Sequence, residues 1–187
     1  MKKCEAFIIG GSAGSLEVLL KVFPVIDSAI SFPIIIVIHR KQGNDSMLAD
    51  LLSSRTSLPV KEVDEKEKIL PGTIYIAPSD YHLLIEQDHT FSLDYSEKVN
   101  YSRPSIDVTF QTAAEVYKDG LVCLLLSGSN SDGVNGLKSV KLWDGIAAIQ
   151  NPDTAQVSYM PAQAQQHVKI DKVLNIEEIG GFLNLLS

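Results

Sequence analysis

Residues 6–22 have the sequence AFIIGGSAGSLEVLLKV, in which a short apolar run leads through a glycine-rich turn into a helical pattern. Ala6–Gly10 is predicted to be a strand, because it is apolar and of strand length. In Ser15–Val22 the apolar residues recur at the spacing of a helix. The rest of the chain repeats this succession of strand and helix, and the repetition decides the fold class.

Short apolar runs alternate with helical patterns along the whole chain. Strands covered on both faces read as continuous apolar runs; the further predicted strands are Pro33–Ile38, Thr73–Ala77, Leu121–Leu126 and Ile146–Gln150. The further predicted helices are Ser46–Leu52 (capped by Asn44 or Asp45), Asp107–Tyr117, Gly136–Leu142, Met160–His167 and Ile176–Leu186. This alternation predicts an α/β fold, doubly wound, with a mainly parallel sheet and helices on both faces.

His82–Glu86 and Thr90–Asp94 flank a polar turn and are predicted to form an antiparallel hairpin at one edge. Lys61–Lys68 is interpreted as a solvated connection.

Length, charge and composition exclude several classes of protein. The chain has 187 residues, a formal net charge of −7 and 45% hydrophobic residues, which is typical of a globular domain. An acidic chain without a basic stripe argues against a general nucleic-acid binder. No apolar run approaches the roughly 20 residues that span a bilayer, and the N-terminus lacks the pattern of a signal peptide. We therefore expect a cytoplasmic protein in which Cys4 and Cys123 are reduced core thiols.

Polar groups follow three of the predicted buried strands. Ser12 lies in the turn after the first strand, His39 follows Pro33–Ile38 directly, and Asp132 lies in Ser127–Gly133 after Leu121–Leu126. Because the carboxyl ends of parallel strands meet at one edge of a sheet, these side chains are expected to lie together. A hydroxyl, an imidazole and a carboxylate are the groups needed for nucleophilic acyl transfer.

Each group has a simpler interpretation when it is taken alone. The turn GGSAGS lacks the Lys-Ser/Thr ending of a P-loop and the spacing GxGxxG, so it is a nucleophile turn, an anion cradle or a plain tight turn. A histidine after a strand is commonly a surface or core residue, and Asp132-Gly133 commonly forms a turn or helix cap. The combination is more specific. A helix that starts at Ser15 would also bring free N–H groups near Ser12, where they favour a developing oxyanion.

The order of these motifs matches that of a known family. Ile9–Ser15 corresponds to a strand followed by GASTGG, Ile36–His39 to a strand that ends in histidine, and Gly128–Gly133 to GMGxDG. Supporting stretches are Leu70–Gly72, Tyr75–Pro78, Arg103–Asp107, Gln150-Asn151 and Met160-Pro161. From about Ala6 to Ile179 the chain resembles the catalytic domain of the chemotaxis protein-glutamate methylesterases, the CheB family. On this resemblance we expect residues 1–187 to be a single catalytic domain without the family's receiver domain.

The resemblance implies a role for each motif residue. Ser12 would be the nucleophile, His39 the general base, and Asp132 the carboxylate that orients His39 and stabilises its protonated form. Backbone N–H groups of Ala13 and Ser129 are the candidates for the oxyanion hole. Arg40, Arg103 and His82 are candidates for the substrate groove, with a solvated or structural role as the alternative for each.

The resemblance also implies the substrate and the partners. The reaction would be hydrolysis of γ-glutamyl methyl esters on the cytoplasmic helices of methylated chemoreceptors, with release of methanol; some relatives also deamidate receptor glutamine. A separate response regulator, kinase or methyltransferase would be a further partner. We expect no nucleic acid, no membrane insertion, no cofactor and no metal.

Four departures from the family pattern support competing hypotheses. Ala13 replaces Thr, Ser15 replaces Gly, Ser129 replaces Met and Asn130 replaces Gly. They motivate an alternative in which the chain is a catalytically weak or inactive signalling module that binds a receptor, kinase or methyltransferase. A third hypothesis is a small-molecule or phosphate binder at the glycine-rich turn.

Overall fold

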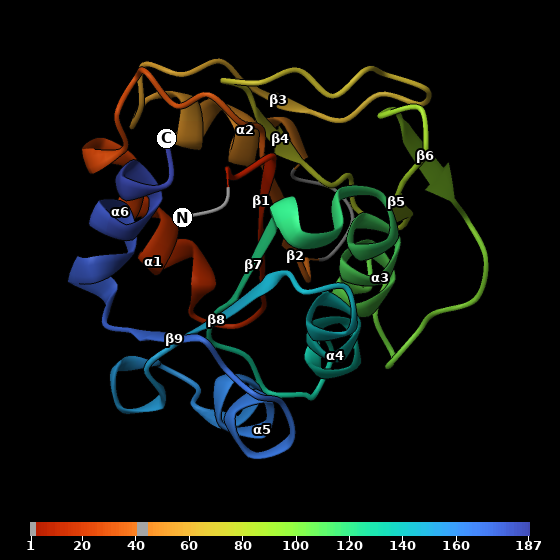
Figure 1. Cartoon of the computed structure of the whole chain (residues 1–187). Coiled ribbons are helices and arrows are strands. Elements are labelled where there is room, and N and C mark those ends of the chain that lie inside the picture. Colours follow the sequence, from red (N-terminus) through yellow and green to blue (C-terminus); the bar gives the residue numbers. More distant parts are fainter. Residues whose placement is uncertain (1–2, 41–44) are drawn as a thin grey trace.

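A seven-stranded parallel sheet forms the centre of the computed structural model, which describes residues 3–40 and 45–187 (Figure 1). The strand order is β3-β4-β2-β1-β7-β8-β9, so the chain builds on one side of β1 first and then on the other. The reversal lies between β1 and β7, where open α/β sheets commonly bind ligands. The strands are β1 (Ala6–Gly11), β2 (Ile34–Ile38), β3 (Val60–Glu62), β4 (Ile74–Ile76), β7 (Leu121–Leu125), β8 (Ile146–Gln150) and β9 (Lys172–Leu174).

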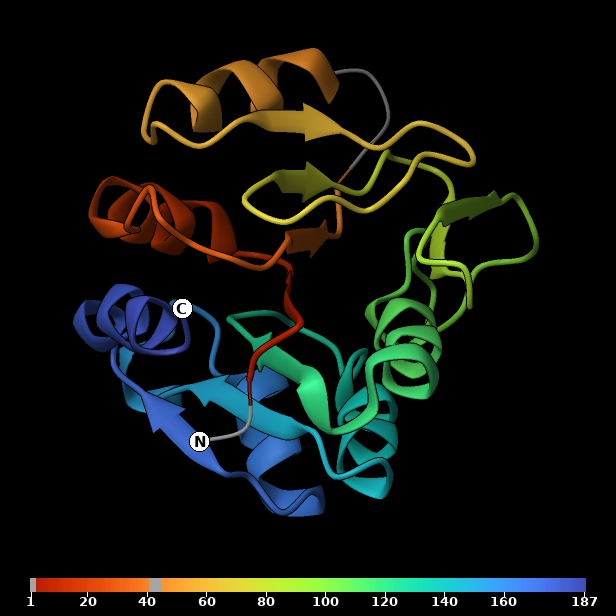
Figure 2. The same ribbon diagram turned by 45° about the horizontal axis from the view of Figure 1, so that its top comes forward.

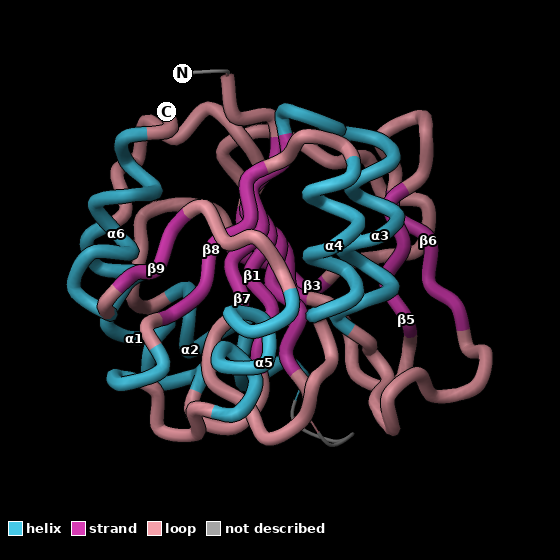
Figure 3. Tube along the Cα trace, turned by 60° about the horizontal axis from the view of Figure 1, so that its bottom comes forward, coloured by secondary structure: helices cyan, strands magenta, loops and turns pink. Residues whose placement is uncertain are grey.

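Helices cover both faces of this sheet, as Figures 2 and 3 show. Helices α1 (Ser15–Val22), α2 (Asp45–Ser53) and α6 (Ile176–Leu185) pack on one face. Helices α3 (Ile106–Tyr117), α4 (Val134–Leu142) and α5 (Tyr159–His167) pack on the other face. Short 3₁₀ turns lie at Phe23–Val25, Lys118–Gly120 and Pro152–Thr154.

Alternate side chains of each central strand enter the two apolar layers. In β1, Phe7 and Ile9 pack with α1 and α6, whereas Ala6 and Ile8 pack on the side of α3 and α4. All six residues of β1 are buried. Burial on both faces explains why this strand reads as a continuous apolar run, and the predicted doubly wound α/β fold class is confirmed.

The predicted hairpin is present as β5 (His82–Ile85) and β6 (Phe91–Asp94), but it forms a two-stranded sheet of its own. It lies against α3, where Thr109 Oγ1 donates to the Leu83 carbonyl at 2.7 Å and Ile85 N–H donates to Thr112 Oγ1 at 3.1 Å. The edges of the large sheet are β3 and β9.

Edge strand β3 overlaps the segment that we interpreted as a solvated connection, and β9 was not predicted. Each has three residues, two of which in β3 are charged, so neither carries an apolar periodicity. Helix α2 begins at Asp45; Asn44, the other candidate cap, lies outside the described residues. Within the described ranges no helix has the length and hydrophobicity to cross a bilayer.

Two glycines with left-handed backbone begin the helices that follow β1 and β7. Gly14 (φ 85°) precedes α1, and Gly133 (φ 95°) precedes α4 directly after Asp132. At such φ values a Cβ meets steric resistance, so glycine is favoured. A Cβ on Gly133 would also lie 2.6 Å from Leu125 Cδ1. The turn that carries Asp132 therefore requires glycine.

We predict that Gly133→Ala lowers the free energy of unfolding by at least about 1 kcal/mol, because a non-glycine residue is strained in this conformation. Gly181→Ala is the matched control, since no described residue lies within 4 Å of its added Cβ and its helical backbone accepts alanine. The control should be more stable by about 0.5–1 kcal/mol. Urea unfolding measures both changes, and equal stability of the two variants would contradict the argument.

Candidate active site

Backbone hydrogen bonds bring the ends of β1, β2 and β7 together. Ser12 N–H donates to the Ser127 carbonyl at 2.9 Å, and His39 N–H donates to the Gly11 carbonyl at 3.1 Å. Ser12 directly follows β1, His39 directly follows β2, and Asp132 lies in the loop between β7 and α4. The sheet itself thus places all three predicted residues at one rim.

His39 and Asp132 form the central contact of this rim. His39 Nε2 lies 2.7 Å from Asp132 Oδ2, and the aspartate side chain is fully buried. Burial alone would raise the pKa of Asp132, but hydrogen bonds from His39, Asn100 and the Ile106 N–H bring the pKa below its ordinary value. Asp132 is therefore a carboxylate at neutral pH, and His39 Nε2 donates its hydrogen to it.

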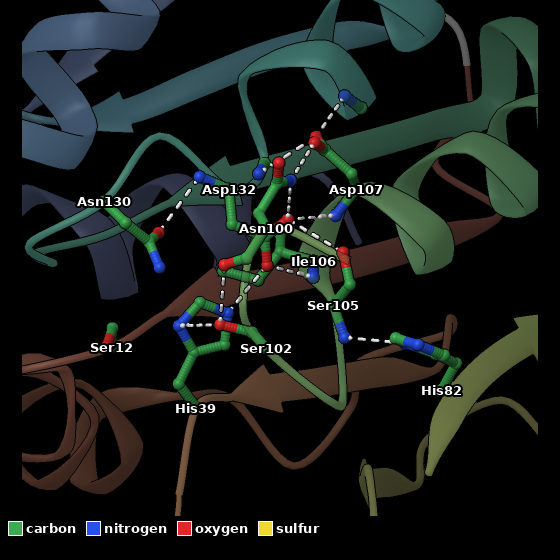
Figure 4. A network of polar contacts seen from close by, with 12 residues as sticks. Ser12, His39, His82, Asn100, Ser102, Ser105, Ile106, Asp107, Asn130 and Asp132 are labelled. Carbon is green, nitrogen blue, oxygen red and sulfur yellow. Dashed lines mark hydrogen bonds and ion pairs between the residues drawn. The ribbon is translucent and has the colours of Figure 1, made fainter. Parts of the chain in front are cut away.

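Four more donors surround the Asp132 carboxylate (Figure 4). Oδ1 accepts from Ser105 Oγ at 2.8 Å, Asn100 Nδ2 at 3.0 Å and Asp107 N–H at 3.1 Å; Oδ2 accepts from Ile106 N–H at 2.7 Å. Ile106 and Asp107 are the first residues of α3, so the carboxylate also binds the positive end of that helix. Asp132 is held in one position before any substrate binds.

Asp107 makes the reciprocal contact with α4. Its Oδ1 accepts from Gly136 N–H at 2.6 Å and Gly133 N–H at 2.9 Å, while Asn100 Nδ2 donates to Oδ2 at 2.8 Å. Burial raises the pKa of Asp107, and the nearby Asp132 charge raises it further. Asp132 thus caps α3, the helix that contains Asp107, and Asp107 caps α4, the helix that follows Asp132. Asn100 links the two carboxylates.

The contact with Asp132 leaves Nδ1 as the basic nitrogen of a neutral His39 ring. A neutral imidazole has one N–H and one lone pair. Since Nε2 carries the hydrogen, the lone pair is on Nδ1, and Ser102 Oγ lies 3.3 Å from it. A hydroxyl that reacts through this ring must therefore give its proton to Nδ1.

Ser12 lines the same pocket as His39, but the two side chains are not hydrogen-bonded. The pocket has a volume of 580 Å³, and Gly14, Leu16, Ile38 and Leu51 are among its other lining residues. Figure 4 shows Ser12 on the β1 side of the site, with no contact drawn to His39. Of the two contacts expected in the triad, the structure contains the one between imidazole and carboxylate.

The two predicted oxyanion donors belong to segments that lie next to Ser12. Ala13 follows it in the chain, and Gly128, the neighbour of Ser129, is close enough that an added Cβ would lie 3.1 Å from Ser12 Cβ. In the described part of the chain, neither the Ala13 N–H nor the Ser129 N–H donates a hydrogen bond. Their role as oxyanion donors therefore stays a prediction.

The three predicted groove residues differ in position. Arg40 and Arg103 line a second pocket of 470 Å³ beside His39. Arg40 pairs with Glu62 at 3.0 Å, and Arg103 pairs with Asp80 at 2.7 Å and covers the Tyr95 ring. His82 does not face the groove: it is 1% exposed, and its ring nitrogens bind the Glu97 carbonyl and the Ser105 N–H. The expectation for His82 is corrected, because both of its nitrogens hold neighbouring backbone.

Sequence reasoning missed the polar residues that hold the pair in place. Ser102 contacts His39, and three further residues donate to the Asp132 carboxylate: Asn100, Ser105 and Asp107. Asn100 also donates to the Asp107 carboxylate. Ser105 and Asp107 lie in the stretch Arg103–Asp107, which we quoted only as a supporting motif. Ser, Asn and Asp just before and within the first turn of a predicted helix were the available signal. Among the described residues no cluster of histidine, cysteine and acidic side chains could hold a metal ion.

The fold and the site define an α/β protein with the groups of a serine hydrolase at the point where its strand order reverses. The model of the family described as CheB methylesterase matches residues 7–183. The chain belongs to the CheB methylesterase family.

Individual relatives agree with this assignment. A Thermotoga maritima protein named protein-glutamate methylesterase/protein-glutamine glutaminase is 35% identical over 89% of this chain and 49% of its own length. A Leptospira interrogans protein that carries this name provisionally is 44% identical over 94% of this chain and 91% of its own length. The crystal structure of the Thermotoga maritima CheB methylesterase catalytic domain matches with a TM-score of 0.94 and 34% identity, over 98% of this chain and 99% of that one.

We predict opposite acid responses for Asp132→Asn and Asp107→Asn. The pKa of Asp132 is lowered on folding, so its carboxylate stabilises the fold above the unfolded value of 3.8. That stability is lost as the pH falls through the lower folded pKa. The free-energy gap between wild type and Asp132→Asn, about 1–3 kcal/mol at neutral pH, should therefore shrink below pH 3.8.

The pKa of Asp107 is raised on folding, so its protonation favours the folded state. The free energy of unfolding of wild type should therefore rise relative to that of Asp107→Asn as the pH falls from above the folded pKa of Asp107 toward 3.8. Urea unfolding across this pH range tests both variants. If the free energy of unfolding depends on pH in the same way in both variants, the pKa values of the two carboxylates are not shifted in opposite directions.

Proposed function

We propose that this chain is a protein-glutamate methylesterase that hydrolyses γ-glutamyl methyl esters on chemoreceptor helices, and that it also accepts receptor glutamine as an amide substrate. The observation that supports this most is the contact between His39 and the buried Asp132 carboxylate, in a site whose pocket Ser12 also lines. In the described part of the chain, the Ala13 and Ser129 N–H groups donate no hydrogen bond. The names of the relatives support the substrate class.

The mechanism begins with attack of Ser12 Oγ on the ester carbonyl carbon. His39 Nδ1 accepts the serine proton, and the Asp132 carboxylate stabilises the imidazolium that forms. The N–H groups of Ala13 and Ser129 bind the negative oxygen; one such donor is typically worth about 10²–10³ in rate. The imidazolium then protonates the departing methoxide, which leaves as methanol, and Ser12 holds the glutamyl group as an ester.

The second half repeats the same proton transfers with water. His39 Nδ1 accepts a proton from water as its oxygen attacks the glutamyl-serine ester. The tetrahedral oxyanion again lies at the Ala13 and Ser129 amides. Collapse returns the proton from Nδ1 to Ser12 Oγ and releases glutamate. For a glutamine substrate the leaving group is ammonia in place of methanol, and the remaining steps are unchanged.

The four departures from the family pattern are compatible with this chemistry. Ser15 Oγ donates to the Ser127 carbonyl at 2.9 Å and accepts from Ser12 N–H at 3.1 Å, so it supports the nucleophile turn. Asn130 Oδ1 accepts from Asp132 N–H at 3.0 Å, and the left-handed position in this loop is Gly133. Ala13 and Ser129 contribute backbone groups, which a change of side chain preserves.

Two pockets that meet at His39 and Arg40 indicate how a receptor helix would bind. The 580 Å³ pocket has an apolar wall from α1 and α2, whereas the 470 Å³ pocket is polar, with Lys98 and Tyr101 at its rim. We propose that the methylated glutamate enters between them. Apolar neighbours on the helix would contact Leu16 and Leu51, and acidic neighbours would face Lys98. A cytoplasmic setting, in which Cys4 and Cys123 remain reduced, fits the free state of both buried thiols.

A catalytically inactive signalling module is the second candidate function, and the missing contact between Ser12 and His39 favours it. On that hypothesis the chain would bind a receptor, kinase or methyltransferase without turnover. The two hypotheses differ in whether Ser12 forms a covalent bond. A serine-directed fluorophosphonate followed by peptide mass spectrometry answers that question directly.

We predict that Ser12→Ala lowers kcat for methanol release from a methylated receptor fragment by about 10³-fold or more, because the nucleophile is removed. Ser139→Ala, on helix α4 and remote from the pockets, is the matched control and should keep wild-type activity. Thermal unfolding of both variants should resemble that of the wild type. Substantial turnover by folded Ser12→Ala would exclude Ser12 as the nucleophile.

A further inference from the structure

The lone pair of His39 Nδ1 faces a hydroxyl that the proposed mechanism does not use. Ser102 Oγ lies 3.3 Å from Nδ1, while Ser12, which needs the same lone pair, makes no hydrogen bond to the ring in the described structure. Figure 4 shows Ser102 against the imidazole on the side toward Asn100. A nitrogen with one lone pair accepts one strong hydrogen bond at a time, so the two serines compete for it.

The backbone places Ser102 there. Asn100 (φ 51°) and Tyr101 (φ 62°) are both left-handed, and Val99 and Ser102 exchange backbone hydrogen bonds of 3.1 and 2.9 Å across them. This is a two-residue turn with positive φ at both central positions, which is costly for a residue such as tyrosine. Asn100 of the same turn bonds to Asp107 and Asp132. The carboxylates therefore anchor the turn, and the turn brings Ser102 to His39.

We infer that Ser102 is a positioning residue that occupies His39 Nδ1 in the substrate-free protein and must yield it to Ser12 before the ester is attacked. This inference rests on the proposed function, because it assumes that Ser12 uses His39 as its base. The Ser102 hydroxyl has an alternative acceptor, since the Asn100 carbonyl lies 3.4 Å from its oxygen. Rotation toward Asn100 frees Nδ1 without moving the backbone.

Ser102 itself is poorly placed to be the nucleophile. Its own N–H donates to the Val99 carbonyl, and the nearby N–H groups of Ile106 and Asp107 are occupied by Asp132. Ser12, in contrast, is followed by Ala13 and lies close to Gly128, which precedes Ser129. Among the described residues, the N–H groups of Ala13 and Ser129 donate no hydrogen bond. An oxyanion formed at Ser12 could accept from the Ala13 and Ser129 N–H groups, whereas the N–H groups near Ser102 already donate to other acceptors. The role of Ser102 is therefore to hold the base.

The test compares Ser102→Ala with Ser102→Thr in the full chain, using a small fluorophosphonate that reacts with an activated serine. Loss of the competing hydroxyl in Ser102→Ala should speed labelling of Ser12 by about two- to tenfold, the range that corresponds to one net hydrogen bond. Ser102→Thr keeps a hydroxyl and should label at close to the wild-type rate. A purely structural role would slow labelling in both variants.

Peptide mass spectrometry of each labelled protein locates the modified serine. Unchanged or slower labelling of Ser12 in Ser102→Ala would overturn the inference, as would label on Ser102 in the wild type. Ser12→Ala separates this failure from that of the proposed function. If Ser12→Ala labels as fast as the wild type, the proposed function is wrong; if it does not label and Ser102→Ala shows no acceleration, only the role of Ser102 is wrong.

Discussion

The five hydrogen bonds to the Asp132 carboxylate are the interaction on which the rest of the site depends. Removing a buried carboxylate from water is costly, and that cost is met only because its oxygens accept from His39, Asn100, Ser105 and the first N–H groups of α3. The same bonds fix the position of α3 against the loop before α4. Asp107 makes the complementary bonds to α4. One network therefore sets both the position of the His39–Asp132 pair and the packing of α3 against α4.

The parallel sheet supplies the second constraint. His39 and Ser12 need no long side chain to approach one another, because they follow neighbouring strands whose ends are joined by backbone hydrogen bonds. Asp132 reaches them from β7, on the other side of β1. A reversal of strand order opens a crevice at this place in α/β sheets. The three residues proposed for catalysis thus lie at the rim where the topology leaves room for a substrate.

Sequence reasoning succeeded where a strong periodic pattern was present and failed where tertiary contacts decide. Ser15–Val22 and Ile146–Gln150 were predicted with the bounds that the structure shows, since each has an uninterrupted pattern. Strand β3 is formed of three residues that pair with β4, and nothing in their composition indicates a strand. The prediction that the ends of β1, β2 and β7 lie at one edge needed only the topology of a parallel sheet. The roles of Asn100 and Ser102 could not be predicted in this way, because they depend on a left-handed turn whose sequence contains no glycine.

The site divides into a part that is already formed and a part that is not. His39, Asp132, Asn100 and Ser102 are linked by hydrogen bonds. Ser12 belongs to a different unit, the turn between β1 and α1, which is held by Ser15 and Ser127. The proposed mechanism requires a hydrogen bond between these two units, and the described structure contains none between Ser12 and His39. Because Ser12 and His39 line the same pocket, the proposed ester substrate would enter where the final hydrogen bond has to form.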